Sequence, residues 1–287
     1  MSRPWPAVGL IVNADDLGWS EGVNRGIFQA HREGIVSSAT LAANMPAAEA
    51  ALAALDKHPR LGVGLHLNVC QGRPLSRSAA EVLAPDGGAM DRTGAEVIRL
   101  CLLHRRLALA AIQEEFTAQV EWALAAGLRP THVDTHRHVH AWPAVFRLVG
   151  RLCERYDIPF VRRHREVLIG RGWPRAPRKQ RRTSRILNLL GRRCERIAPG
   201  LLGTTGTVGV AHTGAIDRAF LRRAIGTLGP GVTEIMTHPG CADGLEVGAT
   251  TRLLESRQAE LEALCDGDLI RGLADRGIER VHYGQLI

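Results

Sequence analysis

The chain lacks both a cysteine framework and any long apolar run. Its six cysteines are scattered over 287 residues without a Cys-x-x-Cys pair, so neither a disulfide scaffold nor a zinc ribbon is predicted. They are typical of reduced, mostly buried cysteines in a cytosolic protein. No apolar stretch reaches membrane-spanning length, and the run Ala7 to Val12 is too short for a secretory signal. We therefore expect a cytoplasmic protein that is not integral to a membrane.

The composition is that of an ordinary globular protein. Hydrophobic residues make up 45% of the chain and charged residues 23%, which excludes a disordered or fibrous protein and predicts a packed core. The length is within the range of one α/β barrel domain. No internal repeat is evident. We therefore expect one domain over residues 1–287.

Basic charge is concentrated in one segment. From Arg162 to Arg196 there are 13 Arg or Lys and two Glu, a net charge of +11 against +8 for the whole chain, so the rest is net negative. We interpret residues 162–205 as a basic insertion. Trp173 and several Ile and Leu residues lie among its arginines, which fits contact with an anionic membrane surface. A solvated loop, or a helix in a dimer contact, explains the segment equally well.

Apolar β-type runs alternate with helix-like stretches, the pattern of parallel βα units. Nearly every strand candidate ends in a polar or ionisable residue, and the carboxyl ends of parallel strands share one rim. The sequence therefore predicts a distorted (β/α) barrel with a site at its C-terminal rim. The strand-end residues are Asp15, Asp16, Asn44, His66, Asn68, Asp134, His136, His212 and His238.

Four of these residues form a candidate metal site. One Asp and two His leave coordination positions open for water and substrate, so Asp15 or Asp16 with His66 and His136 could hold a divalent cation. Adjacent strand residues point to opposite faces, so one carboxylate could bind metal while the other acts as a base. The run from His132 to His140 predicts five residues on one face of an extended strand. These are His132, Asp134, His136, His138 and His140.

Four motifs in order resemble the YdjC-type carbohydrate deacetylases. They are Asn13-Ala14-Asp15-Asp16-Leu17-Gly18, Gly64-Leu65-His66-Leu67, Asp134-Thr135-His136-Arg137-His138 and Thr237-His238-Pro239. Leu17 stands where the family commonly has Phe, and the basic insertion is outside the shared pattern. The resemblance implies a distorted barrel formed as a single deacetylase domain.

The resemblance also implies roles for individual residues. Asp16, His66 and His136 would bind one divalent ion, Zn²⁺ or Mg²⁺, with Asp15 as the general base and His238 as the acid that protonates the leaving amine. We also predict substrate-binding roles for four strand-end or loop residues, which are Asn44, Asn68, His138 and His212.

Residues 208–214, Val-Gly-Val-Ala-His-Thr-Gly, resemble the hopanoid-biosynthesis-associated branch of this family. That resemblance implies an N-acetylglucosaminyl hopanoid as substrate, and peripheral contact with the inner membrane surface would fit it. A deacetylase of soluble chitooligosaccharides would use the same catalytic residues. A basic nucleic-acid-binding protein is a rival from another class, but the segment has few aromatics, so we expect no nucleic-acid partner. A homodimer is a further hypothesis.

Overall fold

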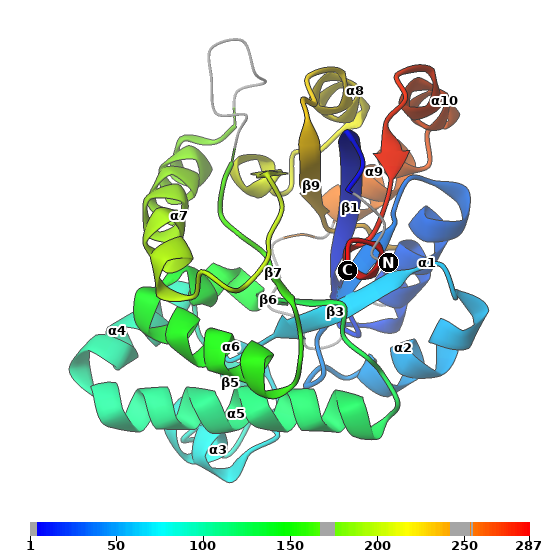
Figure 1. Cartoon of the computed structure of the whole chain (residues 1–287). Helices are drawn as coiled ribbons and strands as arrows, with labels where there is room; N and C mark the ends of the chain where they lie inside the picture. The colour runs from blue at the N-terminus through cyan, green and yellow to red at the C-terminus, as the bar shows by residue number, and fades with distance from the viewer. Residues whose placement is uncertain (1–4, 167–175, 242–252, 254) are drawn as a thin grey trace.

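The computed structural model describes residues 5–166, 176–241, 253 and 255–287. Its main sheet has eight strands, all paired in parallel, in the order β7-β6-β3-β2-β1-β9-β8, with β10 beside the first residues of β1 (Figure 1). The strands are β1 Val8–Leu17, β2 Ser38–Leu41, β3 Gly62–Leu67, β6 His132–Thr135, β7 Phe160–Val161, β8 Gly206–Val208, β9 Gly231–Thr237 and β10 Glu279–Arg280.

Helices surround this sheet, and a short antiparallel pair lies apart from it, formed by β4 Gln71–Gly72 and β5 Met90–Asp91. The α-helices are α1 Glu21–Glu33, α2 Ala48–Ala54, α3 Arg77–Leu83, α4 Gly94–Leu103, α5 Arg105–Ala125, α6 Pro143–Arg155, α7 Arg178–Ile197, α8 Arg218–Gly226, α9 Glu255–Leu264 and α10 Gly267–Asp275. The 3₁₀ turns are η1 Leu55–Lys57, η2 His136–Ala141, η3 Val210–His212 and η4 Tyr283–Gln285.

The predicted distorted barrel with parallel strands is confirmed, in the form of a curled half-barrel. The two ends of the strand order, β7 and β8, are not paired with each other directly. Isolated parallel bridges join Phe160 to Leu202 and Glu166 to Thr207, and the backbone N–H of Thr207 donates to the carbonyl of Arg165 at 2.9 Å. The segment after β7 therefore spans the seam without forming a regular strand.

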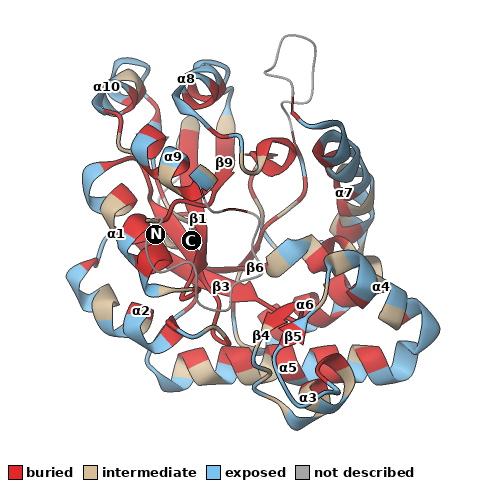
Figure 2. Cartoon of the chain, turned by 180° about the vertical axis from the view of Figure 1, so that it is seen from behind, coloured by how far each residue is buried: buried red, intermediate tan, exposed pale blue. Residues whose placement is uncertain are grey.

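The strands β1, β3 and β9 are buried along almost their whole length (Figure 2), whereas both residues of β10 are exposed. All ten residues of β1 except Val8 are buried, and so are all six of β3. Apolar side chains dominate the core, yet the C-terminal halves of the strands also bury Asp, His and Thr. Buried ionisable groups must be paired or bind a cation, so their partners define the candidate site.

The basic segment contains a regular helix, α7, of 20 residues, and a helix is one of the alternatives that the sequence left open for it. Trp173 lies outside the described residues. The final run 281–287 contains η4, and its Tyr283 is fully buried. One local prediction from the sequence is wrong. The predicted extended strand through the histidine run ends at Thr135, because the chain turns into η2, where Arg137 and His138 have left-handed φ values of 55° and 57°.

Gly64 lies where β3 packs closely against His132 of β6. A Cβ at this position of β3 would lie 2.4 Å from Nδ1 of His132 and 2.5 Å from its carbonyl oxygen. Gly64→Ala should therefore lower the free energy of unfolding by about 1–3 kcal/mol, the usual cost of overpacking, as measured by urea denaturation. Gly88→Ala is the matched control, because nothing lies within 4 Å of the added methyl group. Equal stability of the two variants would contradict this close packing.

Candidate metal and catalytic site

A bulge near the end of β1 brings both aspartates to the rim. The pairing of β1 with β2 shifts between Ala14 and Leu17, and Asp16 has a left-handed φ of 68°. Asp tolerates this conformation better than most residues, but at some energetic cost. The bulge breaks the alternation that would send two adjacent side chains to opposite faces. Asp15 and Asp16 are therefore both buried in contact with the same group of polar side chains.

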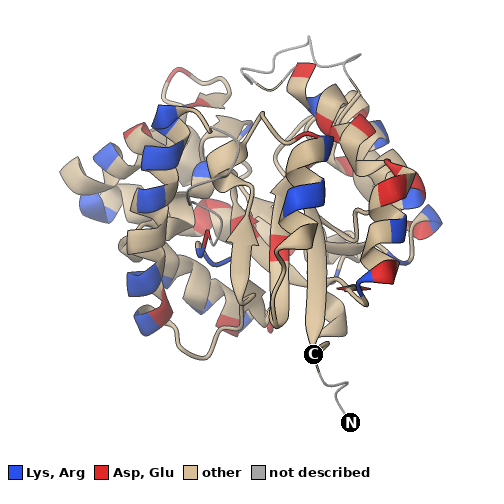
Figure 3. Cartoon of the chain, turned by 90° about the horizontal axis from the view of Figure 1, so that it is seen from above, with Lys and Arg blue, Asp and Glu red and all other residues tan. Residues whose placement is uncertain are grey.

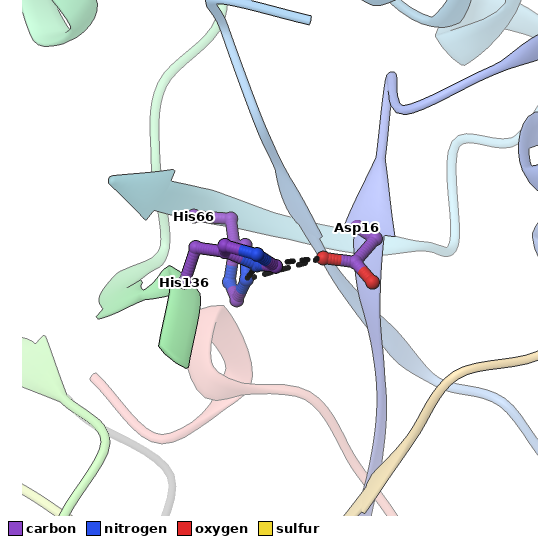
Figure 4. A group of neighbouring side chains, drawn as sticks. All are labelled: Asp16, His66 and His136. Atoms are coloured by element: carbon purple, nitrogen blue, oxygen red, sulfur yellow. Dashed lines mark hydrogen bonds and ion pairs between the residues drawn. The ribbon is translucent and has the colours of Figure 1, made fainter. Parts of the chain in front are cut away.

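His66 at the end of β3 and His136 at the start of η2 both face Asp16 (Figure 4). His66 Nδ1 lies 2.6 Å from Oδ1 of Asp134, so it donates to that carboxylate and leaves Nε2 to face the site. His136 Nε2 lies 2.9 Å from the Gln71 amide oxygen, which leaves Nδ1 to face the site. Such outer partners fix the tautomers of metal-binding histidines.

The three facing atoms form a nearly equilateral triangle. Asp16 Oδ1 lies 3.3 Å from His66 Nε2 and 3.2 Å from His136 Nδ1, and the two nitrogens are 3.3 Å apart. Ligands held at about 2.0–2.2 Å from one ion have such separations. Asp16 Oδ1 is buried and has no hydrogen-bond partner among the described residues. The residues therefore fit a divalent cation, which they would hold through one oxygen and two nitrogens.

The other oxygen of Asp16, Oδ2, accepts a hydrogen bond from an arginine. Arg257, from α9, is 1% exposed and donates from Nη2 to Asp16 Oδ2 at 2.5 Å. Burial alone would raise the pKa of Asp16, but Arg257 and the two imidazoles lower that pKa well below its usual range. Asp16 is thus an ionised carboxylate with one oxygen aimed at the two histidines.

A second buried guanidinium orients Asp15. Arg162 donates to both oxygens of Asp15, at 2.6 and 2.7 Å, and also contacts Asp134 at 2.6 Å and Glu234 at 2.7 Å. Asp15, His66 and Asp134 form another group of possible ligands, but the Arg162 cation already contacts both of its carboxylates. A metal ion would therefore fit better at Asp16, His66 and His136.

Charge balance agrees with a divalent ion. Four carboxylates contact two guanidinium groups in this network, and His66 connects its two parts. Two negative charges remain when these six groups are ionised and His66 is neutral, as a metal ligand must be. The members of the network are Asp15, Asp16, Asp134, Glu234, Arg162 and Arg257. A bound divalent cation would neutralise that remainder, and buried charge that is not neutralised is costly.

His238 directly follows the last residue of β9. Its Nε2 is 4.0 Å from Asp15 Oδ2, and its backbone N–H donates to Glu260 at 2.7 Å. Burial lowers the pKa of His238 to about 4 despite the neighbouring aspartates. The imidazole is therefore neutral at pH 7 and can receive a proton before it passes one on.

The predicted substrate-binding residues have mixed surroundings. Asn44 and Asn68 are buried and both donate to the carbonyl of Gln71, at 2.9 and 2.8 Å, so they hold the loop that carries a partner of His136. His138 packs edge-on against His164, with ring centroids 4.9 Å apart, and His212 packs on Phe220. Contact of these four residues with substrate stays a prediction.

Sequence reasoning missed three residues of the network. Arg162 was counted only as part of the basic segment, and Arg257 lies 241 positions from its partner Asp16. Glu234 offered a signal, because a charged residue in the middle of the apolar run Val232 to Met236 has to find a buried partner. Its partners are Arg162 and the hydroxyl of Tyr283, which donates to Glu234 at 2.8 Å.

Comparisons with known proteins agree with this fold and its rim. The profile of the YdjC-like protein family matches residues 9–275. A solved structure from Enterococcus faecalis, provisionally described as a cellobiose-phosphate cleavage protein, superposes with a TM-score of 0.77. It is 21% identical and the match covers 98% of this chain and 99% of that one, so it supports the fold alone.

Curated relatives carry deacetylase names. A carbohydrate deacetylase of Geobacillus stearothermophilus is 35% identical over 95% of this chain and 96% of its own. One from Brevibacillus brevis is 34% identical over 96% and 99%. A chitooligosaccharide deacetylase of Proteus mirabilis is 28% identical over 97% and 98%. The chain belongs to the YdjC-like family, as its motifs predicted.

Metal binding should release a proton. Burial lowers the pKa of His66, but Asp134 and the other carboxylates outweigh it and raise that pKa to about 10 in the metal-free protein. A metal ion must displace this proton, so near pH 7 we expect about one proton released per ion and an affinity that falls roughly tenfold per unit decrease in pH. Calorimetry in buffers of different ionisation enthalpy measures both.

Asp134→Asn provides the comparison, since it removes the carboxylate that raises the pKa of His66 most strongly. This variant should release fewer protons per ion at the same pH. Binding of metal by the wild type at pH 7 without proton release would contradict the assigned state of His66.

Proposed function

We propose that the protein is a metal-dependent N-deacetylase that hydrolyses the acetamido group of an amino sugar to acetate and a free amine. The observation that carries this proposal is the triangle of Asp16, His66 and His136 beside a second, separately anchored carboxylate, Asp15. The full-length similarity to carbohydrate deacetylases supports the same class of reaction. A divalent cation held by the triangle would lower the pKa of a bound water and would stabilise the oxyanion that forms when this water attacks the acetyl carbonyl.

Asp15 is suited to take the proton from the attacking water. Its Oδ1 accepts from both Arg162 and the Asn13 amide, whereas Oδ2 accepts from Arg162 and lies 4.0 Å from Nε2 of His238. Oδ2 is therefore the atom we assign as the base. As the water oxygen bonds to the acetyl carbon and the C–N bond breaks, the proton passes through His238 to the leaving amine.

We further propose that the native substrate is lipid-linked, an N-acetylglucosaminyl hopanoid. This finer assignment is supported by the resemblance of residues 208–214 to the hopanoid-associated branch and by the basic helix α7, which packs against η2 and η3. The structure contains no helix, among its described residues, that is long and apolar enough to cross a membrane.

A soluble chitooligosaccharide is the second candidate substrate. It is favoured by the name of the relative from Proteus mirabilis, which is 28% identical over nearly its whole length. The same triangle and the same base would act on either substrate, because both present an N-acetylglucosamine unit. The two candidates differ only in what contacts the molecule outside that sugar.

Replacing the proposed base distinguishes a loss of acetate release from a loss of metal binding. Asp15→Asn keeps the size of the side chain but removes the proton acceptor, so acetate release should fall about 10²–10⁴-fold while the bound metal content stays unchanged. Asp56→Asn, at an exposed position, is the matched control and should keep full activity. Acetate release by Asp15→Asn at the wild-type rate would contradict the assignment of the base.

Substrate choice has its own test. Metal-reconstituted enzyme should release acetate from an N-acetylglucosaminyl hopanoid in detergent micelles at least tenfold faster than from a chitooligosaccharide, compared as kcat/KM. Equal values would contradict the lipid assignment and leave the deacetylase intact. No release from either substrate by metal-loaded protein would contradict the proposed reaction.

A further inference from the structure

A hollow of about 380 Å³ lies on the outer surface, away from the residues that face the metal triangle. It is formed where the end of α4 and the start of α5 meet the start of α6 and the second half of α7. Its walls combine apolar side chains with guanidinium groups. The residues that matter here are Leu102, Arg105, Trp142, Arg147, Leu190 and Arg193.

The three arginines of this hollow are exposed, and none has an ion-pair partner among the described residues. The helix α7 adds to their charge, since it carries eight Arg or Lys and one Glu in 20 residues. Figure 3 shows many basic and few acidic positions on the side where Figure 1 places α4 and α7. The hollow therefore lies within a strongly positive surface that attracts anions.

Exposed aliphatic side chains lie on the helices that form the hollow. Leu102 is 64% exposed, and Leu103 and Leu107 beside it are 64% and 59% exposed. On α7, Ile186 is 49% and Leu189 59% exposed. Half of the ten large hydrophobic residues that are exposed in the described chain therefore belong to the α4–α5 corner and α7.

The spacing on α7 places its exposed apolar residues among arginines. The helix buries Ser184, Leu187 and Gly191 against the rest of the protein. The opposite stripe, at intervals of three and four residues, contains Arg182, Ile186, Leu189 and Arg193. Leucine and isoleucine flanked by arginine is the arrangement of a helix that lies in a lipid headgroup region.

We propose that this surface, formed by α7 and the α4–α5 corner around the hollow, docks the protein on an anionic lipid bilayer. The arginines would contact lipid phosphates, with a headgroup in the hollow, while the leucines enter the boundary between headgroups and acyl chains. The inference rests on the exposed residues and does not depend on the proposed reaction.

Two other occupants fit the surface less well. A second copy of the chain, related by twofold symmetry, would bring one strongly basic α7 against another, and the like charges would repel. An RNA strand would pair with the arginines but would leave the exposed leucines in water, because base stacking requires aromatic side chains. Trp142 is the single aromatic among the residues that line the hollow, and it is half-buried.

Vesicle co-sedimentation of the full chain tests the proposal. The wild type should bind vesicles of phosphatidylcholine with phosphatidylglycerol, bind those of phosphatidylcholine alone far more weakly, and lose affinity as NaCl is added. Removing one arginine near an anionic surface weakens binding roughly fivefold. Leu189→Ser with Arg193→Gln should therefore weaken binding by more than about tenfold, since it also removes an inserted side chain.

Ile270→Ser with Arg271→Gln on α10 is the matched control, because it makes a comparable apolar-to-polar change and the same charge change at exposed positions on a different helix. It should bind vesicles as the wild type does, and both variants should melt at the wild-type temperature. Failure of the wild type to bind anionic vesicles would overturn the proposal. So would an equal loss of binding in the control variant.

A charge-neutral variant distinguishes lipid from nucleic acid and from self-association. Leu102→Ser with Leu189→Ser should weaken vesicle binding at least fivefold and leave any binding of an RNA oligonucleotide unchanged. Vesicle binding that survives in this variant would overturn the insertion of leucines. A dimer in sedimentation velocity that this variant dissociates would assign the surface to a second copy.

Discussion

The buried guanidinium of Arg162 is the charge around which the rim is built. A cation without exposure to water is tolerated only when carboxylates surround it, and Arg162 contacts Asp15, Asp134 and Glu234. Through Asp15 it fixes the proposed base, and through Asp134 it fixes the partner that orients His66. The proposed base on β1 and a proposed metal ligand on β3 are thus positioned by one side chain.

Much of this rim follows from the sequence, because parallel strands bring their carboxyl ends together. That rule predicted that Asp15 or Asp16 would lie beside His66 and His136. The ordered motifs selected Asp16 and indicated the family. The side-chain alternation of an ideal strand failed at two points. Asp16 and the pair Arg137 and His138 adopt left-handed backbone conformations, which no periodicity predicts, and each redirects the chain at the site.

The remaining partners could not be predicted because they depend on contacts between distant segments. Arg257 reaches Asp16 from α9, and Arg162 reaches Glu234 across the seam of the half-barrel. The arginines of residues 162–196 differ in their surroundings, although the sequence shows only one basic segment. Arg162 is fully buried, whereas most arginines of α7 are exposed. One stretch of sequence therefore serves both the interior of the site and the outer surface.

Glu166 fixes the chain between buried Arg162 and the exposed helix α7. Its backbone bridges to Thr207, and its carboxylate accepts from the N–H groups of Gly209 and Ala211. The strand segment with Arg162 is thus anchored before the chain leaves toward α7, and α7 is anchored separately by its buried face. An insertion or deletion between residue 166 and α7 would not reach the base. The outer surface of such a protein, and with it the choice of substrate, can therefore change while the reacting groups stay fixed.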